Sequence, residues 1–205
     1  MIKKQLKNDT LPKFKRGFKK EAEEWGLKIR EEMGLTKFSP VDAFALAKHK
    51  KIPVFTFDEI LCDLEAEKNL LNNHPSFSAL YTINRDGKKI ILYKNTDSSA
   101  RQQSSIMHEI AHILLEHTVP MELINLANRF GLTYNNTLQE NEAKFLGGCL
   151  QLTIPSLFAS LKKNMTHFDI AEKYFASIEM VNYRINISGV QRVKDYQARK
   201  NNSSL

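Results

Sequence analysis

The sequence is poor in the residues that define several protein classes. It has two cysteines, Cys62 and Cys149, among 205 residues, which is too few for a disulfide-stapled fold. Its eight glycines and six prolines exclude a collagen-like chain. It also contains no run of about 18 apolar residues, the length that a membrane helix needs. We therefore expect a globular protein whose cysteines are reduced, buried side chains.

The first twenty residues also lack an apolar stretch. They do not resemble a secretory signal, so we expect a cytoplasmic protein with no membrane partner. They carry eight Lys or Arg and one Asp, while residues 161–205 carry eight basic and four acidic side chains. Basic ends can attract nucleic acid. Because no aromatic side chains alternate with the N-terminal charges, we expect residues 1–16 to be a solvated basic tail.

The spacing of apolar residues predicts helices around a small sheet. Strands are expected at 52–57, 79–83 and 89–93. The last two are joined through Asp86-Gly87, which is a hairpin signal. Helices are expected at 17–33, 39–49, 58–72, 97–115, 121–130, 139–152, 155–163, 168–174 and 178–187. This is an α+β chain with a small, mainly antiparallel sheet.

One expected helix carries a metal-binding motif in an apolar setting. Residues 108–112 read His-Glu-Ile-Ala-His, and histidines four residues apart lie on one helix face, where both can bind one ion. Neutral imidazole suits Zn²⁺, which takes tetrahedral N, O and S ligands. Glu109 lies about 100° round the helix from His108, where it can reach a metal-bound water. The motif predicts a zinc hydrolase with His108 and His112 as ligands and Glu109 as general base.

A catalytic zinc site needs a third protein ligand and one open position. A third histidine six residues beyond His112 would stand at position 118, which is threonine. We therefore expect a carboxylate further along the chain. Glu142 shares a helix face with apolar residues and is the expected third ligand, with Glu140 as the alternative.

Three further expectations concern the surroundings of the metal. The pair Gly147-Gly148 predicts that its helix backbone packs closely against the helix of the two histidines. Strand 89–93, if it lies at an edge, can hold substrate by strand addition. The candidate donors to the oxyanion are Tyr93 and His117, followed by Tyr81 and Tyr134.

At these residues the chain resembles the ImmA/IrrE family of metallo-endopeptidases, over roughly residues 17–190. Besides His-Glu-Ile-Ala-His, it has Arg101-Gln102-Gln103 before the motif, and Glu142-Ala143 with Phe145 after it. Residues 170–189 resemble the family's C-terminal helix-turn-helix-like segment. Phe175 occupies the turn position that is usually glycine.

The resemblance implies a zincin-like metallopeptidase domain with Zn²⁺ held by His108, His112 and Glu142, and with Glu109 as the base. It also implies a protein substrate, an XRE-type helix-turn-helix repressor, whose cleavage relieves repression of a mobile element, a prophage or a stress regulon. The expected organisation is a basic tail, a peptidase domain, a helix-turn-helix-like segment packed on it and a C-terminal tail, at 1–16, 17–160, 161–192 and 193–205.

The alternative is a regulatory protein that binds DNA or a partner and has a zinc site but little protease activity. The basic C-terminal part favours it, as does the expected helix 178–187, which offers Asn182, Arg184 and Asn186 to bases. Glu109 favours the enzyme, because a structural zinc site does not need that carboxylate.

Overall fold

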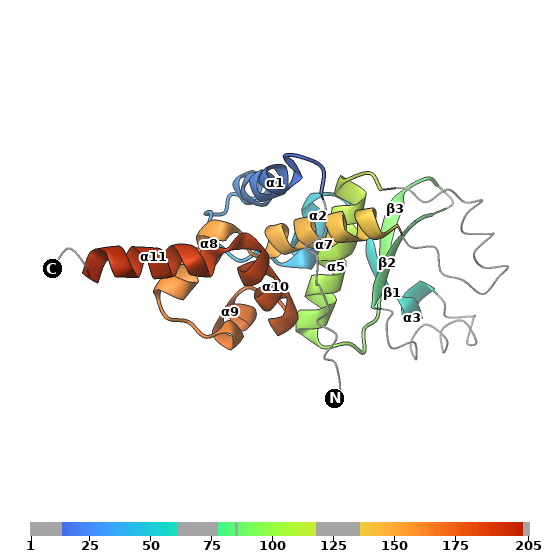
Figure 1. Ribbon diagram of the computed structural model, residues 1–205. Helices are drawn as coiled ribbons and strands as arrows, with labels where there is room; N and C mark the ends of the chain where they lie inside the picture. The colour runs from blue at the N-terminus through green and yellow to red at the C-terminus, as the bar shows by residue number, and fades with distance from the viewer. Residues whose placement is uncertain (1–13, 61–77, 85, 118–135, 203–205) are drawn as a thin grey trace, which may run out of the picture.

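The computed structural model describes residues 14–60, 78–84, 86–117 and 136–202. A small sheet lies at one end of the molecule, and the C-terminal helices lie at the other (Figure 1). The strands are β1 (Val54–Thr56), β2 (Ala79–Ile83) and β3 (Lys89–Tyr93). The helices are α1 (Phe18–Glu32), α2 (Ala43–His49), α3 (Phe57–Ile60), α5 (Ser99–Leu114), α7 (Thr137–Gln151), α8 (Ile154–Lys162), α9 (His167–Lys173), α10 (Ile178–Ser188) and α11 (Val190–Asn202).

The sheet has the order β1-β3-β2 and is mixed. The predicted hairpin is confirmed: β2 pairs antiparallel with β3, and Gly87 has the positive φ of 76° that its turn requires. β1 pairs parallel with β3, so the sheet is mixed, and the expected antiparallel pairing holds only for β2 and β3. Only the hairpin has a local sequence signal, whereas a longer connection places β1. Strand 89–93 does not meet the condition for holding substrate at an edge, because β3 is central and β2 is an edge of the described sheet.

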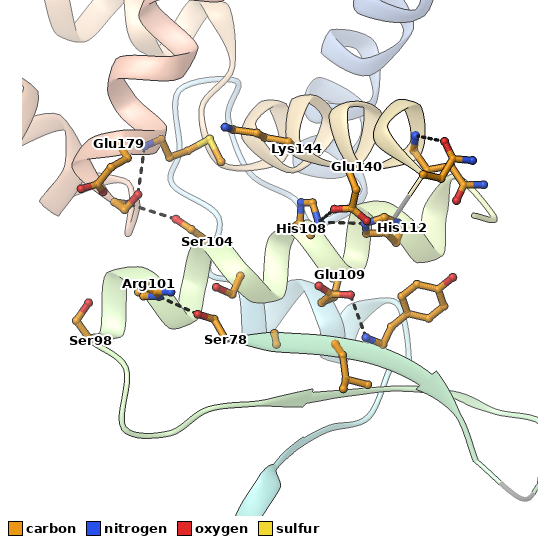
Figure 2. A pocket seen from close by; sticks show the side chains of 18 residues that line it. Ser78, Ser98, Arg101, Ser104, His108, Glu109, His112, Glu140, Lys144 and Glu179 are labelled. Carbon is orange, nitrogen blue, oxygen red and sulfur yellow. Dashed lines mark hydrogen bonds and ion pairs between the residues drawn. The ribbon is translucent and has the colours of Figure 1, made fainter. Parts of the chain in front are cut away.

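Helix α5 lies between β2 and α7 (Figure 2). It packs on β2 and β3 with one side and on α7 with another, and α1 covers α7. The predicted close approach of the glycine helix is confirmed at Gly147, where an added Cβ would lie 3.1 Å from the Met107 carbonyl oxygen and 3.3 Å from the His108 Cα. The main core is therefore built around α5 and α7.

Most predicted helices are present, and their polar caps explain their first residues. The Asn136, Thr153 and Ser177 side chains cap α7, α8 and α10. The second helix begins at Ala43 rather than at 39, because Asp42 accepts the Ala45 N–H and is the actual cap. The expected helix 121–130, most of 58–72, and Cys62 and Tyr134 lie outside the described residues.

The C-terminal helices have a core of their own, formed by residues such as Leu157, Ile170 and Tyr174. α9 and α10 occupy the segment expected to resemble a helix-turn-helix, and that assignment stays a prediction. The turn between them places Phe175 at φ 54°, in the left-handed region that favours glycine. α11 covers most of residues 193–205, which we expected to be a tail. No helix in the described parts of the chain has the length and apolar character needed to cross a membrane.

Candidate metal centre

The motif helix α5 buries its apolar residues and leaves its polar ones at a cleft. Ile106, Met107 and Ile110 are completely buried. His112 and Glu109 are also buried, at 7% and 9% exposure, while His108 is half-buried. Burying an imidazole or a carboxylate without a partner is unfavourable. The partners of these three side chains therefore indicate the role of the helix.

The two motif histidines converge on Glu140, which the sequence offered only as the alternative to Glu142. The Nε2 atoms of His108 and His112 lie 3.0 Å apart. Glu140 lies in the first turn of α7, and its two oxygens are 3.2 Å from His108 Nε2 and 3.5 Å from His112 Nε2. Interaction with the ring of His108, and then with that of His112, holds the pKa of the Glu140 carboxyl well below its usual range. Figure 2 shows Glu140 reaching from α7 to both rings.

These separations match those of ligands around one zinc ion. Donors bound to a tetrahedral Zn²⁺ at about 2.0–2.1 Å lie about 3.3 Å from one another. The three separations, from 3.0 to 3.5 Å and with one Glu140 oxygen towards each ring, bracket that value. Two imidazole nitrogens and a carboxylate are also the donor set of a catalytic zinc site that keeps its fourth position open. His108, His112 and Glu140 therefore fit a zinc ion.

Glu109 points away from the three converging side chains and towards β2. Its Oε2 accepts the backbone N–H of Tyr81 at 2.9 Å, as the dashed line in Figure 2 shows. Burial raises the pKa of the Glu109 carboxyl to about 7, although the nearby His112 and the Tyr81 N–H act in the opposite direction. A carboxyl that changes charge near neutral pH is suited to general-base catalysis.

A cleft of about 1260 Å³ opens at the site. Figure 2 shows β2 on one side of it and α7 on the other, with α5 between them. Residues of the three elements line it together with Ser177, Glu179 and Met180 at the start of α10. The cleft is long enough to reach from the histidines to the C-terminal helices, which suits an extended ligand.

The structure does not bring the expected third ligand, Glu142, to the histidine pair. Residues 140 and 142 are about 200° apart around a helix, so only one of them can face the Nε2 atoms. Glu142 is buried, and its Oε2 lies 3.2 Å from His117 Nε2. The sequence correctly indicated that Glu142 is buried on an apolar helix face. The partner that its carboxylate meets there is His117, not the histidine pair.

The candidate oxyanion donors lie elsewhere. Tyr93 is on the central strand, packs edge-on against Phe44 and does not line the cleft. His117 is buried, and both of its ring nitrogens have partners within the protein. The Tyr81 hydroxyl donates to the His117 carbonyl. Sequence reasoning missed the role of the Tyr81 backbone N–H, because no side-chain pattern reveals a backbone donor.

The candidate DNA-reading side chains of α10 are largely engaged within the protein. Arg184 is completely buried, donates to the Leu152 carbonyl at 3.0 Å and pairs with Glu23 of α1 at 2.5 Å. The Asn182 side-chain oxygen accepts a hydrogen bond from His167 Nδ1 at 2.6 Å. Asn186 is exposed. Arg184 is therefore an internal residue that anchors α10 to α1, and it cannot read bases.

The fold and the site together define a protein with a candidate metal centre of the His-Glu-x-x-His type. The model of a peptidase family, described as the IrrE N-terminal-like domain (peptidase M78), matches residues 65–186. The chain belongs to the ImmA/IrrE family, and this membership indicates a metallopeptidase-type function.

Two other comparisons add little to this. A comparison with curated proteins gave no match. A solved structure described as a Mycobacterium tuberculosis transcriptional regulator is similar to 84% of this chain, with 13% sequence identity and a TM-score of 0.48. The chain spans about half, 47%, of the length of that structure.

Proposed function

We propose that the protein is a zinc-dependent endopeptidase with a zincin-like active site. The observation that carries the proposal is the convergence of His108, His112 and Glu140 at ligand spacing, with the buried carboxyl of Glu109 next to His108 on the same helix. Glu140, rather than Glu142, would then be the third ligand. The family match supports a peptidase, since this donor set alone is compatible with other zinc hydrolases.

The chain's own residues supply the remaining parts of the reaction. Zinc, when bound, lowers the pKa of a coordinated water and polarises the carbonyl of the scissile bond. Glu109 removes the proton of the attacking water and then delivers it to the leaving amine. The Tyr81 N–H fixes one oxygen of Glu109, so the carboxylate keeps its orientation while it exchanges the proton.

We further propose that the substrate lies in the cleft in an extended form. β2 lines the cleft and is an edge of the described sheet, so its outer backbone groups, apart from the Tyr81 N–H that Glu109 accepts, can pair with a substrate strand. Family membership points to an XRE-type helix-turn-helix repressor as the substrate, whose cleavage would relieve repression in the cytoplasm. Buried Arg184 weakens the alternative of a DNA-binding protein.

The test compares wild type with Glu109→Gln, both loaded with zinc. Gln keeps the size of the side chain and can still accept the Tyr81 N–H, but it cannot act as a base. Each protein is incubated with an extract of the native host, and new peptide N-termini are mapped by mass spectrometry. The proposal predicts cuts that appear only with wild type, including one in a helix-turn-helix repressor, and a loss of rate in the variant of about 10²–10⁴-fold.

The exposed Glu172→Gln is the matched control and should cut like wild type. Identical cuts by wild type and Glu109→Gln, with one zinc bound to each, would refute the peptidase. Cuts by wild type that spare every repressor would refute only the proposed substrate.

A further inference from the structure

The segment after α5 folds back so that His117 lies against His112. The helix ends in a Schellman motif: Glu116 has a positive φ of 54°, its N–H donates to the Ile113 carbonyl, and the His117 N–H donates to the His112 carbonyl at 3.0 Å. In this motif the residue in the position of His117 packs on the residue in the position of His112. The Tyr81 hydroxyl, which donates to the His117 carbonyl, holds the turn from the side of β2.

A chain of three side chains leads from the candidate metal position into the interior. His112 directs Nε2 towards His108 and Glu140, and its Nδ1 lies 3.0 Å from His117 Nδ1. His117 Nε2 in turn lies 3.2 Å from Glu142 Oε2. His117 and Glu142 are each only 7% exposed, so water does not compete for these hydrogen bonds.

With His112 and His117 both neutral, one arrangement of protons satisfies the contacts of His112 with His117 and of His117 with Glu142. A carboxylate can only accept, so His117 donates its Nε2–H to Glu142. Neutral His117 then has an unprotonated Nδ1, which must accept from His112 Nδ1–H. That leaves His112 Nε2 without a proton and with its lone pair directed at the point where His108 and Glu140 converge. This is the tautomer that a metal ligand needs.

From this geometry we propose that His117 and Glu142 are positioning residues that fix the ring and the tautomer of His112 for metal binding. The inference rests on the proposed function, and it assigns a role to two residues that do not touch the metal or the substrate. It also explains a buried carboxylate and a buried histidine that the peptidase reaction does not otherwise use. Outer partners of this kind typically contribute 10–100-fold to metal affinity.

The first test measures zinc affinity by competition with a chromophoric chelator, which does not depend on peptidase activity. His117→Leu removes the acceptor for His112 Nδ1–H and should weaken zinc binding about 10–100-fold. His117→Asn places an amide oxygen near the position of Nδ1 and should restore most of that affinity. The exposed His49→Asn is the matched control and should bind like wild type.

The second test reads the tautomer directly. Long-range ¹H–¹⁵N NMR of the zinc-loaded protein should show His112 protonated at Nδ1 in wild type and in His117→Asn. His117→Leu combined with Glu142→Gln should bind zinc about as weakly as His117→Leu alone, because both changes break the same chain. Circular dichroism confirms that each variant is folded, and His117→Asn keeps the test valid if His117→Leu does not fold.

Two results would overturn the inference. One is wild-type zinc affinity in His117→Leu, and the other is an equal loss in His117→Leu and His117→Asn, which would indicate a packing role. Glu140→Gln, measured in parallel, separates this failure from that of the proposed function. If Glu140→Gln loses zinc and the His117 variants do not, only the positioning role fails; if Glu140→Gln binds zinc normally, the proposed site itself is wrong.

Discussion

Helix α7 has a polar cluster at each of its ends, and the two clusters differ in which of their atoms meet. At its beginning, Glu140 meets His108 and His112, and the atoms that converge are lone-pair donors. At its end, the guanidinium of Arg30 donates to the carbonyls of Gly26, Ser39 and Gln151 at 2.8–2.9 Å. Arg184 lies at the same end and pairs with Glu23.

The difference shows how to distinguish a functional cluster from a structural one. In the arginine cluster, most of the guanidinium N–H groups face carbonyl and carboxylate oxygens of the protein itself, and no added ion is needed to bring them together. In the histidine cluster, two ring nitrogens and a carboxylate face one another, and they need a cation or extra protons between them. Burial and polarity alone do not separate the two cases, whereas the direction of the donors does.

The largest effect on stability is expected in the arginine cluster. Arg184→Met leaves Glu23 and the Leu152 carbonyl without their partner, so the free energy of unfolding should fall by about 3–5 kcal/mol. Chemical denaturation of the zinc-free protein measures this. The exposed Arg192→Met on α11 is the control. A loss below about 1 kcal/mol would show that this cluster does not hold α10 in place.

The opposite pattern is expected at the histidine cluster. Glu140→Gln should weaken zinc binding by more than about 100-fold, because a ligand contributes more than an outer partner does. The free energy of unfolding of the zinc-free protein should change by less than about 1 kcal/mol, since the Glu140 side chain is 44% exposed. Glu142→Gln should lose less zinc affinity than Glu140→Gln. The reverse order would make Glu142 the ligand, as the sequence suggested.

The buried carboxyl of Glu109 should lower the free energy of unfolding at neutral and higher pH. Its pKa of about 7 in the folded state lies above its ordinary 4.5, so the native state binds the extra proton and stability falls as pH rises from about 4.5 through 7. Glu109→Gln removes this cost and should be more stable than wild type by up to about 3 kcal/mol at pH 8.

Thermal unfolding of both zinc-free proteins at pH 4.5 and pH 8 checks this, with equal stability expected at the lower pH. A constant difference at both values would contradict the titration of Glu109. Peptidase activity should rise with pH as Glu109 loses its proton, with a midpoint near its pKa of about 7. A bound cation favours the carboxylate and moves the midpoint of this pH profile lower.

The smallest effect is expected at the turn between α9 and α10. Phe175→Gly relieves the positive φ of 54° and should raise the free energy of unfolding by about 0.5–1 kcal/mol without changing zinc affinity. Phe168→Gly is the matched comparison, because Phe168 is also exposed but lies within α9, where glycine destabilises a helix. A loss of stability in both variants would mean that contacts of the Phe175 ring outweigh its strain.

Local patterns in the sequence predicted the helices and the hairpin well. Apolar spacing located α5 and α7, and Asp86-Gly87 located the β2–β3 turn. The motif placed His108, Glu109 and His112 on α5, where His108 and His112 converge. These features depend on residues close together in the chain, where helix and hairpin geometry fix the outcome.

The errors arose where distant segments meet. Periodicity showed that Glu142 is buried, but it could not show that His117, brought round by the turn at Glu116, is the partner. The charge of Arg184 suggested a contact with DNA, but its partner is Glu23, which lies 161 residues away in the sequence. The parallel pairing of β1 with β3 is likewise a long-range contact without a local signal.

The close contact of Gly147 with α5 has a consequence for genetics. A methyl group at this position would meet the backbone of Met107 and His108 at 3.1–3.3 Å, so an alanine there would push the helix of Glu140 away from the helix of the histidines. A screen for inactive alleles should therefore recover substitutions at Gly147 alongside those at the motif, although glycine contributes no chemical group. A single glycine would thus determine how closely α7 and α5 can approach each other.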